Sequence, residues 1–209
     1  MGVAVLVLGP SGSGKSTSLR NFELGEIGIL NVAGKPLPFR KKLEILDHAR
    51  YNQIHNVLRA NKKRAYAIDD SQYLMAFDSF AKAKQKGYDK FVDMAVAFEG
   101  LLEAATKTND DTVVYFLHHT ETGDDGRVKA KTIGKMLDNQ LTIEGLFPIV
   151  LLAECVDGQY RFITNSDGTN PCKSPIDMLD NPMDNDLKAV DAAIREYWNM
   201  RPLNGGDEK

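Results

Sequence analysis

The sequence has few of the features that mark exported or membrane-spanning proteins. It contains only two cysteines, Cys155 and Cys172, in 209 residues, so reduced thiols are expected and not a disulfide framework. No apolar run approaches the roughly 18 residues that a membrane helix needs. The chain also begins without a basic segment, an apolar stretch and a cleavage site, so no export signal is expected. These absences predict a cytoplasmic protein with no membrane partner.

Basic charge is not in excess either. The 26 lysines and arginines are outnumbered by 29 acidic residues, which gives a formal net charge of −3. A protein that binds nucleic acid over its whole surface would be more basic than this. Any DNA-binding surface must therefore be local.

What the sequence does contain is the composition and patterning of a globular α/β protein. Apolar residues make up 43% of the chain and charged residues 26%, both ordinary values. The length suffices for one well-cored domain. Strand-like and helix-like patterns alternate along the chain, which predicts a mainly parallel sheet flanked by helices.

The predicted elements follow from apolar periodicity and from Gly, Pro and Asp punctuation. Strands are expected at 3–8, 27–32, 65–68, 112–117, 149–155 and 159–164, and helices at 15–22, 47–60, within 71–108, at 134–139 and at 187–198. Loops are expected at 33–42 and 121–131, and Asp157–Gly158 is a hairpin signal between the last two strands. We expect one domain over 1–198, with a C-terminal hairpin and helix, and a flexible tail over 199–209.

The first predicted strand leads directly into a glycine-rich segment. This segment reads Gly9, Pro10, Ser11, Gly12, Ser13, Gly14, Lys15, Ser16 and Thr17, and a predicted helix follows it. The pattern is that of a Walker A phosphate loop in the context that the motif requires. Gly12 and Gly14 let backbone amides approach phosphate oxygens. Lys15 is expected to reach the β- and γ-phosphates of ATP, and the Ser16 hydroxyl to ligate Mg²⁺.

A second acid is needed to complete the metal shell. Asp69 ends a predicted apolar strand and has the placement of a Walker B aspartate, so Ser16 and Asp69 are the expected metal ligands. Asp70 could orient the attacking water or support the metal shell. The alternative is that both aspartates begin a loop or cap a helix.

Four segments together resemble a known family. They are Gly9–Thr17, Ala67–Ser71 (Ala-Ile-Asp-Asp-Ser), Phe116–Glu121 (Phe-Leu-His-His-Thr-Glu) and Lys131–Leu137 (Lys-Thr-Ile-Gly-Lys-Met-Leu). The chain resembles RecA-core P-loop ATPases, and more narrowly the phage-encoded ATPases of single-strand annealing and recombination (Sak-four type). This resemblance implies a RecA-like fold over most of the chain.

The resemblance also implies roles for individual residues. A sensor of the γ-phosphate is expected at His118, with His119 and Thr120 as neighbouring candidates. Because no Cys/His cluster accompanies the histidines, zinc is not expected. Single-stranded DNA is expected to contact the loops at 81–88 and 121–131, through Lys82, Lys84, Lys86, Tyr88, Arg127, Lys129 and Lys131. The alternatives for the basic residues are solvated surface or, for Arg127, Lys129, Lys131 and Lys135, contact with the nucleotide of a neighbouring subunit.

The function implied by the resemblance is an ATP- and Mg²⁺-dependent, single-stranded-DNA-binding protein. It would act as a homo-oligomer in phage DNA recombination, annealing or repair, in the host cytoplasm, with a single-strand-binding protein as a further candidate partner. The predicted second strand at 27–32 lacks the catalytic glutamate of RecA, and only Glu23 and Glu26 lie nearby, so hydrolysis is expected to be slow or DNA-stimulated.

Two other functions use the same loop. One is a nucleoside or nucleotide kinase, which needs an arginine-rich lid, whereas residues 121–135 hold a single arginine, Arg127. The other is a packaging or partner-regulating switch ATPase.

Overall fold

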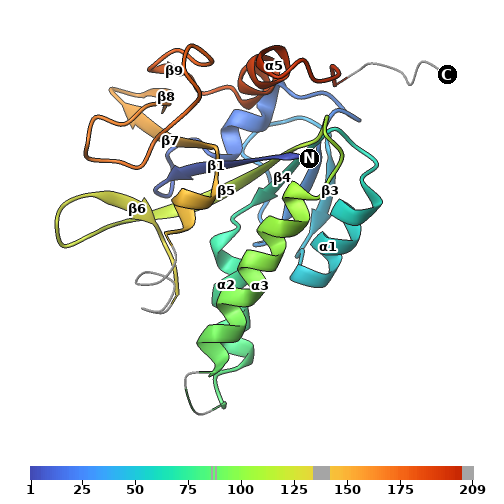
Figure 1. Cartoon of the computed structure of the whole chain (residues 1–209), viewed down its shortest axis with the longest axis vertical. Helices are drawn as coiled ribbons and strands as arrows, with labels where there is room; N and C mark the ends of the chain where they lie inside the picture. Colours follow the sequence, from blue (N-terminus) through green and yellow to red (C-terminus); the bar gives the residue numbers. More distant parts are fainter. Residues whose placement is uncertain (86, 88, 134–141, 204–209) are drawn as a thin grey trace.

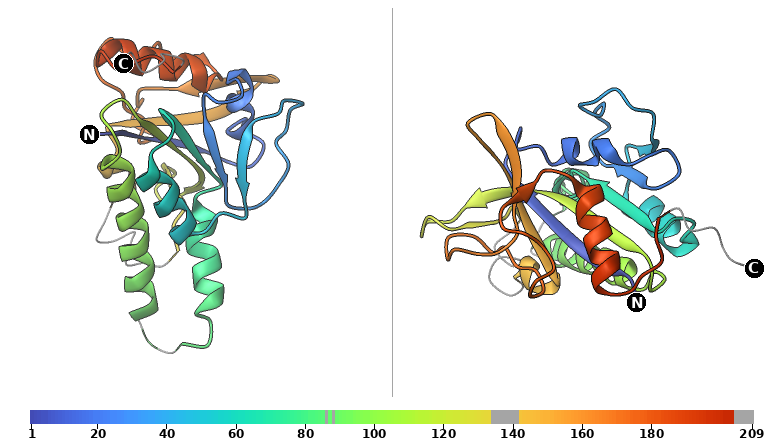
Figure 2. Two further views of the ribbon diagram at one scale, coloured as in Figure 1. Left: turned by 90° about the vertical axis from the view of Figure 1, so that its right-hand side faces the viewer. Right: turned by 90° about the horizontal axis from the view of Figure 1, so that it is seen from above.

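A computed structural model describes residues 1–85, 87, 89–133 and 142–203. They form a mostly parallel mixed sheet with helices on both faces, so the predicted α/β class is confirmed (Figures 1 and 2). No helix within these ranges is long and apolar enough to cross a bilayer. The predicted helix at 134–139 and the end of the predicted tail, 204–209, lie outside the described residues.

The centre of the sheet is parallel and its flank is antiparallel. In spatial order the parallel strands are β3 (Glu44–Asp47), β2 (Gly28–Asn31), β4 (Ala65–Asp69), β5 (Val113–Thr122), β1 (Val3–Gly9) and β7 (Ile149–Val156). The antiparallel strands β8 (Gln159–Ile163) and β9 (Met183–Asp184) follow β7, and β6 (Val128–Ala130) pairs with the end of β5. The predicted hairpin around Asp157–Gly158 is therefore confirmed as β7–β8.

The register brings the carboxyl ends of the central strands to one edge. Gly9 at the end of β1 is opposite His119 of β5, and Asn31 at the end of β2 is opposite Asp69 of β4. In open parallel sheets, ligands bind outside the carboxyl ends of the strands. The strand register thus places Gly9, Asn31, Asp69 and His119 at this edge of the sheet.

Helices cover the two faces of the sheet over separate apolar cores. One face packs against α1 (Tyr51–Ala60), α2 (Gln72–Ala81), α3 (Asp89–Thr106) and the short helix η2 (Ile143–Leu146). The other face packs against the short helix η1 (Ser16–Asn21) and the amphipathic helix α5 (Leu187–Tyr197). Helices α2 and α3 extend beyond the sheet as a two-helix arm (Figure 2).

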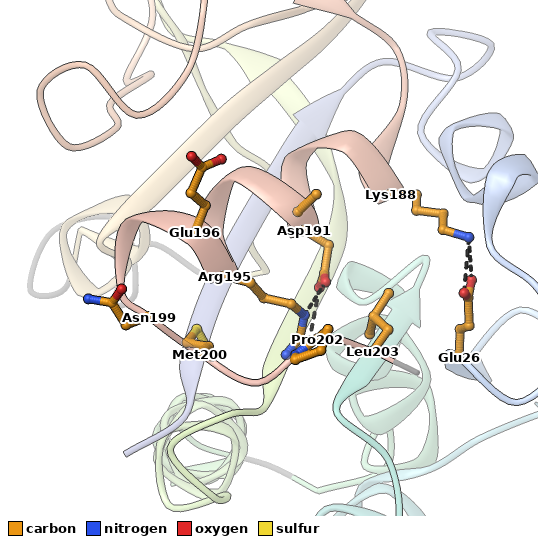
Figure 3. Close-up of a pocket in the computed structure, with 10 residues that line it drawn as sticks. Glu26, Lys188, Asp191, Arg195, Glu196, Asn199, Met200, Pro202 and Leu203 are labelled. Atoms are coloured by element: carbon orange, nitrogen blue, oxygen red, sulfur yellow. Dashed lines mark hydrogen bonds and ion pairs between the residues drawn. The ribbon is translucent and has the colours of Figure 1, made fainter. Parts of the chain in front are cut away.

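A buried polar network fixes α5 to the sheet. The Tyr115 hydroxyl donates to Asp191 Oδ1 at 3.0 Å, and Arg195 forms an ion pair with the same carboxylate (Figure 3). Arg195 also donates to the main-chain oxygens of Arg64 (2.7 Å) and Asp111 (2.9 Å). Because every one of these charges has a partner, the network has a structural explanation.

The sheet contains strands that the sequence did not predict, among them the two-residue strand β9. Strand β3 was not predicted, and residues 47–50 precede the helix α1 that was predicted to begin at 47. Strand β5 continues to Thr122 and turns back into β6, where a loop was predicted. Strands β3 and β6 are only four and three residues long, so they are too short for apolar periodicity to predict them.

The helix after the glycine-rich segment is shorter and tighter than predicted. It is a 3₁₀ helix over Ser16–Asn21, whereas an α-helix was expected over 15–22. Ser18 explains part of this, because its hydroxyl donates to the Lys15 carbonyl at 2.5 Å and competes with regular helix bonding. The favourable dipole that a longer helix would supply is correspondingly reduced.

Candidate functional site

A cavity of about 340 Å³ lies at the carboxyl edge of the sheet. It is lined by residues from the glycine-rich segment, the ends of β4 and β5, the loop after β2 and the β7–β8 hairpin: Ser11, Gly12, Gly14, Lys15, Ser16, Thr17, Lys35, Pro36, Pro38, Asp69, Asp70, His119 and Tyr160. Residues of the glycine-rich segment, the Asp69–Asp70 pair and His119, which are far apart in the sequence, thus lie around one cavity.

Between β1 and η1, residues 10–15 form a turn in which two glycines have left-handed main-chain conformations. Gly14 has φ +94°, and a Cβ there would lie 2.7 Å from the Tyr160 ring. Gly12 has φ +80° and faces open space. The Ser13 hydroxyl is buried and has no hydrogen-bond partner among the described residues. A ligand could therefore approach the main chain at Gly12, and the buried Ser13 hydroxyl is a donor that such a ligand could satisfy.

Lys15 is folded back onto its own loop. Its Nζ donates to the carbonyl oxygens of Gly9 (2.7 Å) and Pro10 (2.8 Å), and the residue is only 6% exposed. Burial lowers the pKa of the Lys15 amine to about 8, although Asp70 and Asp69 oppose this shift. At neutral pH the group is still mostly charged, and its present partners are carbonyls that an anionic ligand could replace.

Ser16 and Asp69 meet as the sequence predicted. The Ser16 hydroxyl donates to Asp69 Oδ1 at 2.9 Å across 53 residues of sequence. Burial, together with the nearby Asp70 charge, raises the pKa of the Asp69 carboxyl to about 6. A buried carboxylate and a hydroxyl in contact are the ligand types that Mg²⁺ prefers.

Asp70 is held by two cationic or hydrogen-bonding partners. Lys35 Nζ lies 2.7 Å from one carboxylate oxygen, and His119 Nε2 lies 3.2 Å from the other. Burial acts to raise the pKa of Asp70, but the hydrogen bonds from His119 and Lys35 outweigh it and hold the pKa at about 2. The main chain of Asp70 has φ +61°, an uncommon conformation for a residue other than glycine, and its side chain lines the cavity.

The two adjacent histidines lie in different environments. His119 lines the cavity, whereas the predicted sensor His118 is fully buried, with Nδ1 2.9 Å from the Ser71 hydroxyl and Nε2 2.8 Å from the Lys131 carbonyl. Burial lowers the pKa of His118 to about 4, so it is neutral. Successive side chains of a strand point to opposite faces, and this alternation turns His118 away from the cavity.

Sequence reasoning missed Lys35 and Tyr160. Lys35 lies in the loop that follows β2, between Gly34 and the two cavity-lining prolines Pro36 and Pro38. Tyr160 comes from the β7–β8 hairpin, far away in the sequence. The one signal for Lys35 was the position of its loop directly after a parallel strand, where ligand-binding loops occur. For Tyr160 no local pattern indicates the contact.

The predicted DNA-contacting residues lie outside the cavity. Lys82 forms ion pairs with Asp78 (3.0 Å) and Asp93 (3.7 Å), and the exposed Lys84 lies at the tip of the α2–α3 arm. Lys86, Tyr88 and Lys135 are outside the described residues.

The remaining basic candidates belong to the β5–β6 hairpin and the residue after it. Arg127 lies 3.8 Å from Asp125, Lys129 lies 2.9 Å from Glu121, and Lys131 is exposed. In Figure 1 the arm tip and this hairpin extend from different parts of the molecule. Contact with one strand of DNA would thus require a path along the surface or between subunits.

A larger cavity, of about 700 Å³, lies beside α5 (Figure 3). Four of its charged residues form ion pairs with one another: Lys188 with Glu26 at 2.7 Å, and Arg195 with Asp191. Glu26, one of the two glutamates near the second strand, is therefore occupied away from the glycine-rich segment. We assign the functional site to the smaller cavity because its polar groups converge on open space.

No protein-family model matches the chain, and no curated protein is similar to it. Its function must therefore be inferred from the residues of the site.

Asp69→Asn should stabilise the ligand-free protein at neutral pH. The folded-state pKa of Asp69 is raised, so its ionisation destabilises the fold as the pH increases through about 4 to 6. Removing the charge should increase the free energy of unfolding by about 1–3 kcal/mol at pH 7, and the gain should vanish below about pH 4. Urea unfolding across this pH range measures the effect.

Asp70→Asn is the matched control with the opposite sign. Its pKa is lowered in the folded protein, so its charge contributes stability above about pH 4 that is lost as the pH falls toward 2. Equal behaviour of the two variants would contradict the charge arrangement described for the site.

Proposed function

We propose that this chain binds and hydrolyses a nucleoside triphosphate, with Mg²⁺–ATP as the expected substrate, on a RecA-like core. One observation carries the proposal: Lys15, Ser16 and Asp69 converge with an open glycine turn in a single cavity. A turn, a lysine, a hydroxyl and a strand-end aspartate are the parts that phosphate-loop enzymes use to hold a nucleotide.

The residues present fit the proposed ligands. Backbone amides around Gly12 and Gly14 would face phosphate oxygens, and the unpaired Ser13 hydroxyl would gain a partner. Lys15 would exchange the Gly9 and Pro10 carbonyls for phosphate oxygens. Ser16 and Asp69 would hold Mg²⁺, which supplies positive charge to the phosphate oxygens when bound.

Asp70 and His119 are the candidates for the reacting end of the nucleotide. Strand β2 ends in Asn31 and offers no carboxylate there, so Asp70 is the acid left to orient a water molecule. Its low pKa makes it a weak proton acceptor, which supports slow turnover. His119, and not His118, is then the proposed sensor of the terminal phosphate, because it shares the cavity with Lys15.

The cavity favours hydrolysis over phosphotransfer to a second nucleotide. A kinase lid must bring additional positive charge to the phosphates. Among the described residues, no arginine lines this cavity, and Arg127 lies at an exposed turn beside Asp125. The kinase alternative therefore has weaker support.

Single-stranded DNA and further copies of this chain remain the proposed partners. The resemblance to recombination ATPases supports both, as does the exposed Lys84 at the end of the projecting arm. A RecA-like nucleotide site at a subunit boundary would also bring Arg127 or Lys131 within reach of a neighbour. We propose a role in phage DNA recombination, annealing or repair on this basis.

Lys15→Ala should abolish Mg²⁺–ATP binding while the fold survives. Losing the charged hydrogen bonds to phosphate should weaken binding by about a hundredfold or more. The fold should persist because the amine bonds only to its own loop. Calorimetric titration measures the affinity, and Lys63→Ala, which removes a surface ion pair with Glu44, is the control.

Turnover assays should accompany the titration. Asp69→Asn should keep some nucleotide affinity but lose Mg²⁺-dependent hydrolysis. Phosphate release should increase with single-stranded DNA, whereas added nucleoside monophosphates should gain no phosphate. Wild-type hydrolysis in both variants would refute the assigned site, and phosphotransfer would favour the kinase.

Removing lysines at the arm tip should flatten the salt dependence of DNA binding. Replacing Lys82, Lys84 and Lys86 together should reduce the slope of log affinity against log salt by about one unit for each DNA phosphate that the variant no longer binds. Because Lys82 is ion-paired, Lys84→Ala alone should have the larger single effect. Fluorescence anisotropy with a labelled oligonucleotide measures this, with Lys107→Ala beyond the opposite end of α3 as the control. No binding of the wild type at low salt with an ATP analogue would exclude the DNA proposal.

A further inference from the structure

The loop after β2 carries a lysine whose main chain is fixed and whose side chain is exposed. Asn31 is 2% exposed, and its side-chain amide donates to the Lys35 carbonyl at 2.8 Å. The Asn31 side-chain oxygen accepts from the Gly34 amide at 2.9 Å, and its amide also reaches Asp47 at 2.8 Å. The buried asparagine therefore anchors the start of the loop to the ends of β2 and β3.

Neighbouring residues restrict the same loop further. Gly34 has φ +69°, a main-chain conformation that residues with a Cβ rarely adopt, and a Cβ there would also displace the exposed His48 ring, 2.2 Å away. Pro36 and Pro38 fix two further backbone angles just beyond Lys35. The result is a stiff loop that holds Lys35 over the cavity.

The Lys35 side chain contrasts with this fixed backbone. It is 61% exposed, lies 5.2 Å from the centre of the Tyr73 ring, and contacts Asp70 Oδ2 at 2.7 Å. The Asp70 carboxylate in this pair is only 10% exposed and keeps its contact with His119, so release of Lys35 costs Asp70 one of its two hydrogen bonds, which a water molecule entering from the open cavity can replace. Lys35 and Lys15 line the same cavity, so both ammonium groups can face one anion.

We propose that Lys35 is a second phosphate-binding cation of this site, which leaves Asp70 and contacts the terminal phosphate when a nucleoside triphosphate binds. The inference rests on the proposed nucleotide-binding function and adds a residue that belongs to none of the sequence motifs. Asn31 acts as a positioning residue, because it fixes the main chain from which Lys35 reaches the cavity.

The exchange has a chemical consequence for Asp70. With Lys35 in contact, one Asp70 oxygen is occupied by the ammonium group. Once Lys35 moves to the phosphate, this oxygen is free to accept a hydrogen bond from a water molecule. Binding of a triphosphate would thus both add positive charge at the terminal phosphate and expose the carboxylate that orients water.

Lys35→Ala should remove discrimination between triphosphate and diphosphate. The affinity for the imido analogue of ATP with Mg²⁺ should fall about tenfold to a hundredfold, whereas the affinity for ADP should change less than about twofold. Lys35→Arg should retain most of the preference for the triphosphate. Lys107→Ala is the matched control, since this lysine is 70% exposed and contacts Glu103 at 2.6 Å. Calorimetric titration gives both affinities.

A double-mutant cycle tests the exchange itself. Asp70→Asn removes the carboxylate that competes with the phosphate for Lys35. In the wild type this substitution should increase the affinity for the triphosphate analogue. In the Lys35→Ala variant the same substitution should increase that affinity by a smaller factor. An equal gain in both backgrounds would overturn the exchange. Equal losses for ADP and the triphosphate analogue in Lys35→Ala, or no loss for either, would also overturn the proposal. If the wild type binds neither nucleotide, the proposed function itself fails.

Discussion

Three ionisable groups, Lys15, Asp69 and Asp70, are buried together at the carboxyl edge of the sheet, and the design of the site depends on how their charges balance. Burial disfavours the charged form of each group. It lowers the pKa of Lys15 and raises the pKa of Asp69, whereas the hydrogen bonds from His119 and Lys35 outweigh burial at Asp70 and lower its pKa. Two carboxyl groups that are neighbours in the sequence thereby differ in pKa, about 6 for Asp69 and about 2 for Asp70.

Several polar groups of the site have fewer hydrogen-bond partners than they can accommodate. Within the part of the chain that the structure describes, Lys15 donates to two carbonyl oxygens, the buried Ser13 hydroxyl has no hydrogen-bond partner, and Asp69 accepts from the Ser16 hydroxyl. Each of these groups would be better satisfied by phosphate oxygens or by a divalent cation. The site therefore combines partly satisfied polar groups with an open cavity, as expected where binding energy is to be gained from a ligand.

The sequence was sufficient to predict the parts of this account that depend on local patterns. Continuous apolar runs located the strands that end at Gly9 and Asp69, and the glycine spacing located the turn between Gly9 and Lys15. Because parallel strands end at a common edge, these motifs were also expected to meet. Ser16 and Asp69 are in contact at this edge, and their role as metal ligands stays a prediction.

The remaining parts depend on long-range packing, which periodicity cannot show. His118 and His119 are equivalent in sequence, and only the strand's alternation relative to the sheet decides that His119 faces the cavity. Lys35 was hidden in a loop whose shape depends on the buried Asn31 amide, and Tyr160 arrives from a distant hairpin. Packing of the whole core brings these distant segments together, so no local sequence pattern predicts the contact.

A crystal structure with Mg²⁺ and a non-hydrolysable ATP analogue tests the central claim most directly. We predict phosphate oxygens inside the turn between Gly9 and Lys15, with Lys15 Nζ released from the Gly9 and Pro10 carbonyls. We also predict Mg²⁺ between Ser16 and Asp69. A nucleotide bound beside α5, or a Lys15 amine still bonded to its own loop, would contradict the account.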